Sequence, residues 1–571
     1  MQNFIKSKKQ LAVTILLAIS LLFRVLVSIT YIDKMILGCV QVIFNKTLRK
    51  PERWIDILQN TASLAAFALI LVYFLTFTPY GKLLRVNMRQ IFSEYKKSYF
   101  NFITLNRLIF LSAFLFMAYF GIIRSNYFYS DDIFRNYGGN RSWIGFSRYI
   151  SEFGSILIHN SLRLSDVSPL TQLIAIVISA ITLIVLSISL TGSLKIKNLL
   201  ALSIIFISPF YSENISYRFD SPYMAMSLFF SAIPFLFKKD SACFVFVSLL
   251  GLIFTCMSYQ AALPLYILVT IFLFIKNFVD GKNIRKNIIF SAKAVISFVA
   301  ALVIFKIFFM NKMTNKDTDY FSTRIMISAF APNLITYIKT TFSLNGGLLT
   351  KSLSSIAVVS AIFATTRSSK RNKFLSCAVI VMLIILSYSL SFGPYLIFER
   401  PIFKSRAFMG FNSFMALIML MNINFPGKDK KGSNRLQAVI VTLYVYSCLV
   451  FLSVYGNCLK NQNDYENFRV GLILQDLSEM ASKNSQINVS FIGSLDLCEK
   501  NRIALKNYPL IEKIIPILPT ESSSWNYALL NGYNFNCKSS YTKLTPDYSL
   551  MKETTYHDIY QKEDDFIVML R

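Results

Sequence analysis

Two adjacent carboxylates, Asp131 and Asp132, open a polar loop directly after an apolar stretch. Arg135 follows within reach, and aromatic residues flank the pair, as is typical of a site at the level of lipid headgroups. A carboxylate at this position could act as the general base for a sugar hydroxyl in glycosyl transfer, while its neighbour orients the acceptor or a divalent metal ion. Trp143 follows in the same loop. The alternative is that the acidic pair only forms a solvated helix cap.

A second motif lies between two apolar runs and contains Tyr217, Arg218 and Asp220. Arg218 could bind a phosphate, because the planar fork of a guanidinium matches phosphate oxygens, and we expect Asp220 to fix its rotamer. An ion pair that merely satisfies charges at the membrane interface is the alternative interpretation.

A third motif occupies the Pro-bounded connector 393–406 and contains Glu399, Arg400, Lys404 and Arg406. Its three cations stand among aromatic residues and predict a cradle for a lipid phosphate. Positive charge directed at a departing phosphate lowers the barrier where negative charge develops. Anchoring to lipid headgroups is the alternative.

The other chemistry-bearing residues are less specific. We expect the mixed-charge connector 311–344 to cover the site as a mobile loop and His159 to be a hydrogen-bonded structural residue. Cys498 and Cys537 could pair in an oxidising compartment. The sequence has only two histidines and no Cys-x-x-Cys spacing, so we predict no structural metal site and no certain cofactor, with a divalent ion at the acidic pair left open.

The elements that must position these residues are membrane helices. The chain has 571 residues, 54% of them hydrophobic, with a mean hydropathy of +0.49. Its apolar runs are about as long as a bilayer core requires, which indicates a polytopic membrane protein. The formal net charge of +29 lies mostly in short connectors, a pattern typical of cytoplasmic loops and not of nucleic-acid binding. About 13 spans are predicted, at residues 11–30, 61–79, 105–123, 168–190, 197–212, 221–237, 242–258, 260–275, 288–310, 347–365, 374–392, 406–424 and 436–457.

The basic connectors predict a cytoplasmic N-terminus, because Lys and Arg are then concentrated in alternate connectors. With this threading all three motifs face the outer side, together with everything after residue 457. Stretches 487–492 and 566–570 read as short strands. We therefore predict an N-terminal membrane segment with two extra helices (1–104), a catalytic membrane core (105–457) and a small periplasmic α/β domain (458–571).

Taken together, these motifs resemble a known family, the phage and bacterial O-antigen glucosyltransferases of the Gtr serotype-conversion type. The resemblance covers roughly residues 105–260 by motif and the remainder by layout. This sequence departs from the family pattern by about two spans before the motif-bearing loop, so the resemblance gives residues 1–104 no role. It is carried by Asp131-Asp132-x-x-Arg135, Trp143, Asp166-Val167-Ser168-Pro169 and Tyr217-Arg218-Phe219-Asp220-Ser221-Pro222.

The resemblance implies a GT-C type membrane fold in the bacterial inner membrane, with its active site facing the periplasm. It also implies that a hexose, expected to be glucose, moves from a polyprenyl-phosphate donor to O-antigen polysaccharide or its lipid-linked repeat. By position, Asp131 and Asp132 match the acidic pair of the family, and Arg218 and Asp220 its second motif. Two alternatives remain: a transporter or flippase of lipid-linked sugars, and an O-antigen polymerase. A transporter should carry charges near the bilayer midplane, whereas the polar motifs here gather on one side.

Overall fold

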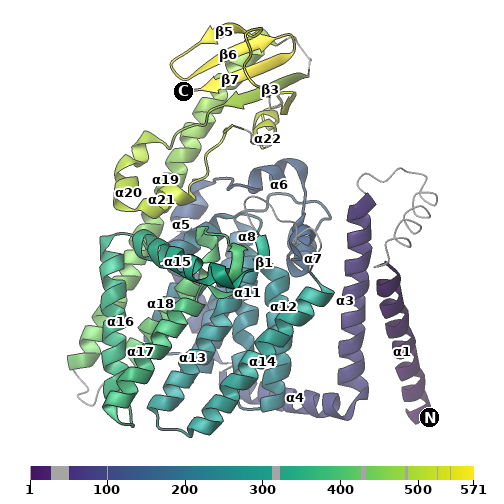
Figure 1. Ribbon diagram of the computed structural model, residues 1–571, viewed down its shortest axis with the longest axis vertical. Coiled ribbons are helices and arrows are strands. Elements are labelled where there is room, and N and C mark those ends of the chain that lie inside the picture. The colour runs from purple at the N-terminus through teal and green to yellow at the C-terminus, as the bar shows by residue number, and fades with distance from the viewer. Residues whose placement is uncertain are drawn as a thin grey trace.

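The computed structural model of the protein describes residues 2–27, 51–99, 101–310, 322–425, 432–481, 486–521, 523, 525–539 and 542–571. These residues form a bundle of long helices with a small sheet beyond one end (Figure 1). We call the end of the bundle nearest the sheet the outer end. The N-terminal helix α1 (Gln2–Val27) stands at the side of the bundle, and the C-terminus lies in the sheet.

Eight of the described helices are long and apolar enough to cross a membrane, and counting two bent pairs as one span each raises the number to ten. The protein is therefore a helical membrane protein, and all eight helices coincide with predicted spans. They are α5 (Phe102–Ser125), α8 (Leu170–Thr191), α12 (Ser241–Ser258), α13 (Leu263–Val279) with the preceding turn η4 (Gln260–Ala262), α14 (Ile284–Phe308), α16 (Leu348–Ser368), α17 (Lys373–Leu390) and most of α19 (Gly432–Met480).

The two bent pairs break at prolines. Helices α3 (Pro51–Phe77) and α4 (Pro79–Tyr99) meet at 85°. Helix α9 (Ile196–Ile207) meets the following segment, η2 (Pro209–Tyr211) with α10 (Ser212–Ser216), at 49°. The residue before a proline is disfavoured in helical conformation, which accounts for both breaks.

Three shorter apolar helices occupy the remaining predicted spans: Gln10–Leu22 within α1, Ser221–Phe237, and α18 (Met409–Asn424). The second of these comprises α11 (Ser221–Ala232) and η3 (Ile233–Phe237). Every residue of α18 from Met409 to Ile423 is buried, because α9, α13 and α16 surround it. Contacts with other helices thus cover this short helix, and the number of about 13 spans stays a prediction.

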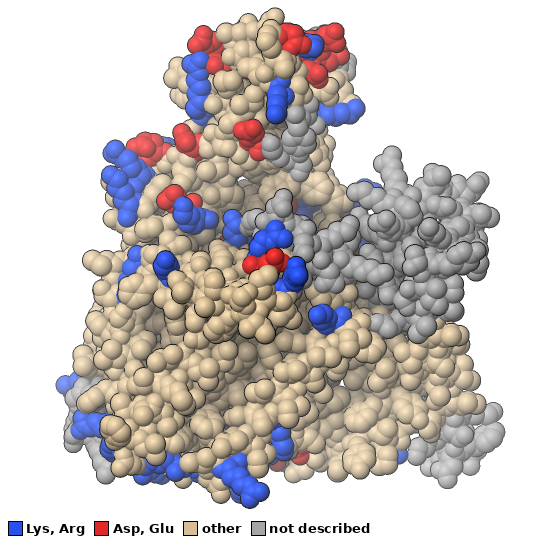
Figure 2. All heavy atoms as spheres, viewed as in Figure 1, with Lys and Arg blue, Asp and Glu red and all other residues tan. Residues whose placement is uncertain are grey.

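Charged side chains are distributed unevenly along the bundle. Figure 2 shows, on the face in view, a broad band of the helical bundle with few charges, bounded by mostly Lys and Arg at the edge opposite the sheet. Both signs of charge occur on the sheet side of this band. An apolar band with a basic edge is the pattern that membrane insertion with a cytoplasmic basic edge predicts.

Tyr217, Arg218 and Asp220 lie in the turn between α10 and α11, and short elements at the outer end carry or adjoin the other predicted site residues. They are α6 (Asp132–Gly138), η1 (Trp143–Phe146), α7 (Tyr149–His159), η7 (Gly393–Ile397), β2 (Phe398–Arg400) and η8 (Ser405–Ala407). Strand β2 pairs antiparallel with β1 (Ser322–Ile325), and η6 (Ile327–Ala329) leads from β1 into α15 (Phe330–Leu344). Of the predicted cover 311–344, residues 311–321 lie outside the described residues, and the remainder forms this strand and helix.

The C-terminal region forms a five-stranded sheet, in the order β4 (Cys537–Ser539), β3 (Ile487–Ile492), β7 (Asp565–Leu570), β6 (His557–Lys562) and β5 (Ser549–Glu553). The two predicted strands are confirmed as β3 and β7, which pair in parallel. Short helices connect the sheet to the bundle: η9 (Glu499–Asn501), α20 (Arg502–Asn507), α21 (Pro509–Ile514) and α22 (Asn526–Asn531).

Helix α19 joins the two regions without a break. Its first half packs against α5, α9 and α16, and its last turns contribute Val470, Ile473 and Leu477 to the apolar core beneath the sheet. The predicted boundary at residue 457 therefore falls inside one continuous helix.

The predicted pairing of Cys498 with Cys537 is wrong, because both thiols are free and buried. The backbone N–H of Cys498 donates to Gln462 of α19 at 2.8 Å, so this residue lies against the helix. Cys537 instead begins strand β4 in the core of the sheet. The two residues thus belong to separate packing environments.

Candidate active site

The two adjacent carboxylates lie in different environments. Asp131 precedes the first turn of α6 and is half-buried. Asp132 is fully buried, and its Oδ2 accepts the backbone N–H groups of Tyr129 at 3.2 Å and Arg218 at 2.8 Å. Burial raises the pKa of the Asp132 carboxyl well above its usual range. Asp132 therefore ties the acidic loop to the second motif, and Asp131 is the more accessible of the two.

Arg135, one turn further along α6, reaches the other end of the second motif. Its Nε lies 3.3 Å from Asp220 Oδ2, and its guanidinium stacks over the Trp143 ring at 4.1 Å. The indole N–H of Trp143 donates to the same Asp220 carboxylate. All three side chains are buried, and their mutual contacts join the first motif to the second.

Arg218 is paired with Asp166, and the expectation that Asp220 fixes its rotamer is wrong. Its Nη2 lies 2.6 Å from Asp166 Oδ2, and its Nη1 donates to the carbonyl of Asn126 at 3.3 Å. Arg218 and Asp220 are two positions apart in a turn, and side chains at that spacing do not face each other. Two of the five guanidinium N–H groups are engaged in these bonds, and a phosphate contact by Arg218 stays a prediction.

We call these six residues the paired network, since each one contacts another member at short range: Asp132, Arg135, Trp143, Asp166, Arg218 and Asp220.

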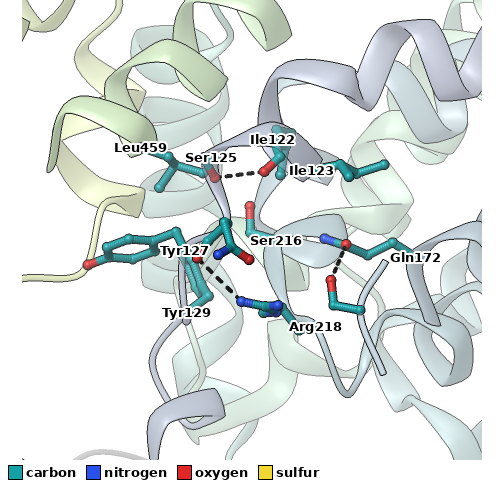
Figure 3. Close-up of a pocket in the computed structure, with 11 residues that line it drawn as sticks. Ile122, Ile123, Ser125, Tyr127, Tyr129, Gln172, Ser216, Arg218 and Leu459 are labelled. Atoms are coloured by element: carbon teal, nitrogen blue, oxygen red, sulfur yellow. Dashed lines mark hydrogen bonds between the residues drawn. The ribbon is translucent and has the colours of Figure 1, made fainter. Parts of the chain in front are cut away.

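A small cavity lies beside the paired network (Figure 3). It has about 10 Å³ of internal space, enough for about one water molecule. Arg218 and Gln172 reach its wall, and Gln172 accepts a hydrogen bond from Ser168 at 3.0 Å. A cavity of this size is too small for a sugar, and the Nε of Arg218 has no protein hydrogen-bond partner.

Arg406 of the third motif meets the second motif. Its Nη1 lies 2.9 Å from Glu213 Oε1 and also donates to the hydroxyl of Tyr217, while its backbone N–H donates to Glu213 at 2.7 Å. Burial raises the pKa of the Tyr217 phenol, Arg406 lowers it, and the charges of Glu213 and Asp131 raise it further. Asp131 is therefore close enough to Tyr217 to act on it electrostatically. We call Asp131, Tyr217 and Arg406 the open cluster, because its two charged members retain solvent exposure.

The other residues of the third motif lie on the β1–β2 pair and the turn that follows it. Glu399 accepts a hydrogen bond from the Ser322 hydroxyl at 3.3 Å, and Arg400 is half-buried opposite Ser322. Lys404 is exposed. Of the three predicted cradle cations, Arg406 is the one that the described structure brings into contact with the second motif.

Sequence reasoning missed the residues that attach the acidic loop to α19. The Tyr127 hydroxyl donates to Glu466 of α19 at 2.9 Å, and the Tyr129 hydroxyl donates to the carbonyl of Ile514. On the sheet side, the rings of Tyr137 and Tyr527 meet edge to face at 5.8 Å. The aromatic residues around Asp131 therefore hold protein elements in place, whereas their spacing alone indicated a headgroup belt.

His159 is a structural residue, as expected. Its Nδ1 lies 2.8 Å from the carbonyl oxygen of Ser165, and its ring stacks on Phe219. Within the described ranges, no three His, Cys, Asp or Glu side chains lie close enough together to hold a metal ion.

Comparisons with known proteins identify the family of this chain. The family described as glucosyl transferase GtrII matches residues 120–417, a segment that contains every predicted site residue from Asp131 to Arg406. One relative is an uncharacterised 55.3 kDa protein in the gtrB 5′ region of Salmonella phage P22. It is 25% identical over 445 residues, which cover 74% of this chain and 90% of the relative. No solved structure matches. Since the family match spans more than half of the sequence, the chain belongs to the glucosyl transferase GtrII family, and its resemblance to Gtr-type glucosyltransferases is confirmed.

Proposed function

We propose that this glucosyltransferase moves glucose from a polyprenyl-phosphate donor to O-antigen at the periplasmic face of the bacterial inner membrane. The observation that carries the proposal is the open cluster. At the outer end of the bundle, Arg406 donates to the Tyr217 hydroxyl, and the negative charge of the half-buried Asp131 raises the pKa of the same phenol. Glycosyl transfer needs these two groups, a base for the acceptor and a cation for the leaving group.

In the proposed step, an acceptor hydroxyl oxygen attacks the anomeric carbon of the donor glucose. The hydroxyl proton passes to Asp131, and the bond between the anomeric carbon and the phosphate oxygen breaks. The electron pair of that bond leaves with the polyprenyl phosphate, beside Arg406. Asp132 is unsuited to the role of base, because it is buried and already accepts two backbone N–H groups.

The side of the membrane is inferred from charge. Lys and Arg predominate at the edge of the bundle opposite the sheet (Figure 2), which supports placing that edge in the cytoplasm. The site then faces the periplasm, where nucleotide-activated sugars are not expected. A lipid-linked sugar donor is consistent with this placement.

The donor is tested with purified full-length protein, labelled glucose on polyprenyl phosphate, and O-antigen as the acceptor. We expect labelled O-antigen from this donor and none from a nucleotide-linked glucose. Transfer from the nucleotide sugar alone would contradict the proposal. Appearance of the intact labelled lipid across a sealed vesicle, with no glycosidic product, would instead favour a flippase, and lengthening of O-antigen without added glucose would favour a polymerase.

The orientation is tested with a reporter that is active only in the periplasm. A fusion after Lys460 should be active and a fusion after Lys430 inactive. The opposite result would place the site in the cytoplasm and contradict the proposed donor.

A further inference from the structure

Arg148 differs from the other arginines near the site in having no acidic partner. Arg135, Arg141, Arg218 and Arg406 each lie within 3.3 Å of a carboxylate oxygen. Arg148 is half-buried, yet no carboxylate of the described residues lies within ion-pair distance of it, and its Nε is buried without a hydrogen-bond partner. Removing a cation from water is costly unless an anion or a hydrogen-bond acceptor compensates. An anionic ligand would supply that compensation.

The surroundings of Arg148 hold its guanidinium in one place. The residue directly precedes α7, and its backbone N–H donates to the carbonyl of Trp143 at 3.1 Å. Its guanidinium carbon lies 4.5 Å from the centre of the Tyr259 ring and 5.4 Å from that of Phe146. Aromatic faces attract a cation but do not neutralise it, and they leave the N–H groups at the edge of the plane available.

Tyr259 connects Arg148 to the open cluster. Burial raises the pKa of its phenol, and the positive charges of Arg406 and Arg148 lower it. The same two arginines act on the Tyr395 phenol, whose pKa is also raised by burial. The positive charges of Arg148 and Arg406 thus act on the same two phenols, and Arg148 lies directly against one of them, Tyr259. An anion that contacts both guanidinium groups would be attracted by each of them.

We propose that Arg148 and Arg406 together bind the phosphate of the lipid-linked donor and retain it as the leaving group. This inference rests on the proposed function, and it adds a phosphate-binding residue outside the three cationic positions of the third motif. Arginine suits the role, because its planar fork binds phosphate oxygens in pairs.

The charge on the phosphate changes during transfer in a way that favours two cations. In the donor it is a diester with a single negative charge. When the bond to the anomeric carbon breaks, the electron pair goes to the phosphate oxygen, and the product is a monoester with close to two negative charges. Interactions that strengthen as this charge develops lower the barrier to transfer. Arg148 should therefore affect both the turnover number and the affinity for the product lipid.

The test uses the full-length protein in nanodiscs of uncharged lipid, titrated with polyprenyl phosphate. We expect Arg148→Gln to weaken binding at least tenfold and to lower kcat/KM for the donor on the order of a hundredfold. Arg148→Lys should show a smaller loss, because it keeps the charge without the fork. Arg163→Gln is the matched control, since Arg163 is an exposed arginine of the same outer region, and it should behave as wild type.

Two further measurements separate the possible outcomes. Thermal unfolding of each variant shows whether the fold is retained, and Arg148→Lys carries the comparison if Arg148→Gln unfolds. If a folded Arg148 variant binds polyprenyl phosphate as wild type while wild type transfers glucose, this inference is overturned and the proposed function stands. If wild type neither binds the lipid phosphate nor transfers glucose from it, both fail. An equal loss of binding to phosphatidylglycerol would assign Arg148 to bilayer lipid and also overturn the inference.

Discussion

The paired network and the open cluster are neighbours at the outer end of the bundle, but their charged side chains differ in exposure. In the paired network, Arg135 and Arg218 each contact a carboxylate and are at most 7% exposed. In the open cluster, Asp131 is half-buried with no ion pair among the described residues, and Arg406 keeps 27% of its side chain exposed. Charges that are closed off by one another hold segments together, and charges that stay accessible remain available for a substrate.

This contrast assigns different roles to residues that the sequence analysis had treated alike. Asp131 and Asp132 are adjacent, yet one belongs to each group. Arg218 and Arg406 both resemble phosphate ligands by residue type, yet the Arg406 side chain is 27% exposed and that of Arg218 only 7%. The predictions below test whether accessibility separates catalysis from support, beginning with the largest expected effect on transfer.

The acidic pair provides the sharpest comparison. Asp131→Asn should lower kcat on the order of a hundredfold or more with an unchanged melting temperature, because it removes only the proposed base. Asp132→Asn should lower the melting temperature, because its amide NH₂ either faces the two backbone N–H donors or takes the place of the buried Oδ1, which has no hydrogen-bond partner. Glucose transfer and thermal unfolding are measured on both purified variants. Equal transfer by Asp131→Asn and wild type would eliminate the proposed base.

Arg406 should come second. Arg406→Ala is expected to raise the apparent KM for the donor tenfold or more and to destabilise the protein, because Glu213 is left buried without its partner. The double variant Arg406→Ala with Glu213→Gln should recover stability without recovering donor binding. Recovery of both would show that Arg406 only supports the fold.

Arg218 should have a smaller effect on transfer. Arg218→Lys keeps the charge but cannot reach Asp166 and the Asn126 carbonyl in the same planar geometry, so we expect a stability loss of roughly 1–2 kcal/mol and a few-fold fall in kcat. The donor KM should stay near the wild-type value. A large increase in the donor KM would instead support the phosphate contact predicted from the sequence motif. It would also contradict the distinction between a supporting paired network and a catalytic open cluster.

Glu466 should affect stability and its dependence on pH, with little effect on transfer. The ordinary pKa of this carboxyl is 4.5. Burial raises it to about 8, although hydrogen bonds lower it in part. The folded protein thus prefers the protonated form. The resulting stabilisation is complete below about pH 4.5 and is lost as the pH rises through 8, at roughly 1.4 kcal/mol per pKa unit as an upper bound.

Thermal unfolding between pH 5 and 9 tests this assignment. The wild-type melting temperature should fall over this range, and Glu466→Gln should flatten the curve, because an amide does not titrate. Asp464→Asn is the matched control, since it also converts a carboxylate of α19 to an amide but at an exposed position, and its curve should follow that of wild type. Parallel curves for wild type and Glu466→Gln would contradict the raised pKa.

Much of the architecture is predictable from the sequence, because apolar runs of membrane length have few structures available to them. The strands β3 and β7 were also predictable from their β-branched and aromatic residues. The partners within the site were not. Arg135 pairs with Asp220, which is 85 positions away in the sequence. Arg218 pairs with Asp166 and not with Asp220, which is closer in sequence. The packing of α6 against the second motif decides which carboxylate each arginine can reach. Arg148 and Tyr259 were visible as residue types, but only their contact distinguishes them from other polar residues of the outer connectors.

The unbroken course of α19 fixes the rotational phase between membrane and sheet. Successive residues of a helix are turned by about 100° from one another. One residue added between Cys458 and Val470 would therefore swing the sheet to another side of the helix and separate Tyr527 from Tyr137. Seven added residues would restore the phase almost completely and lift the sheet by about 10 Å. The helix thus sets both the direction in which the sheet faces and its height above the bilayer.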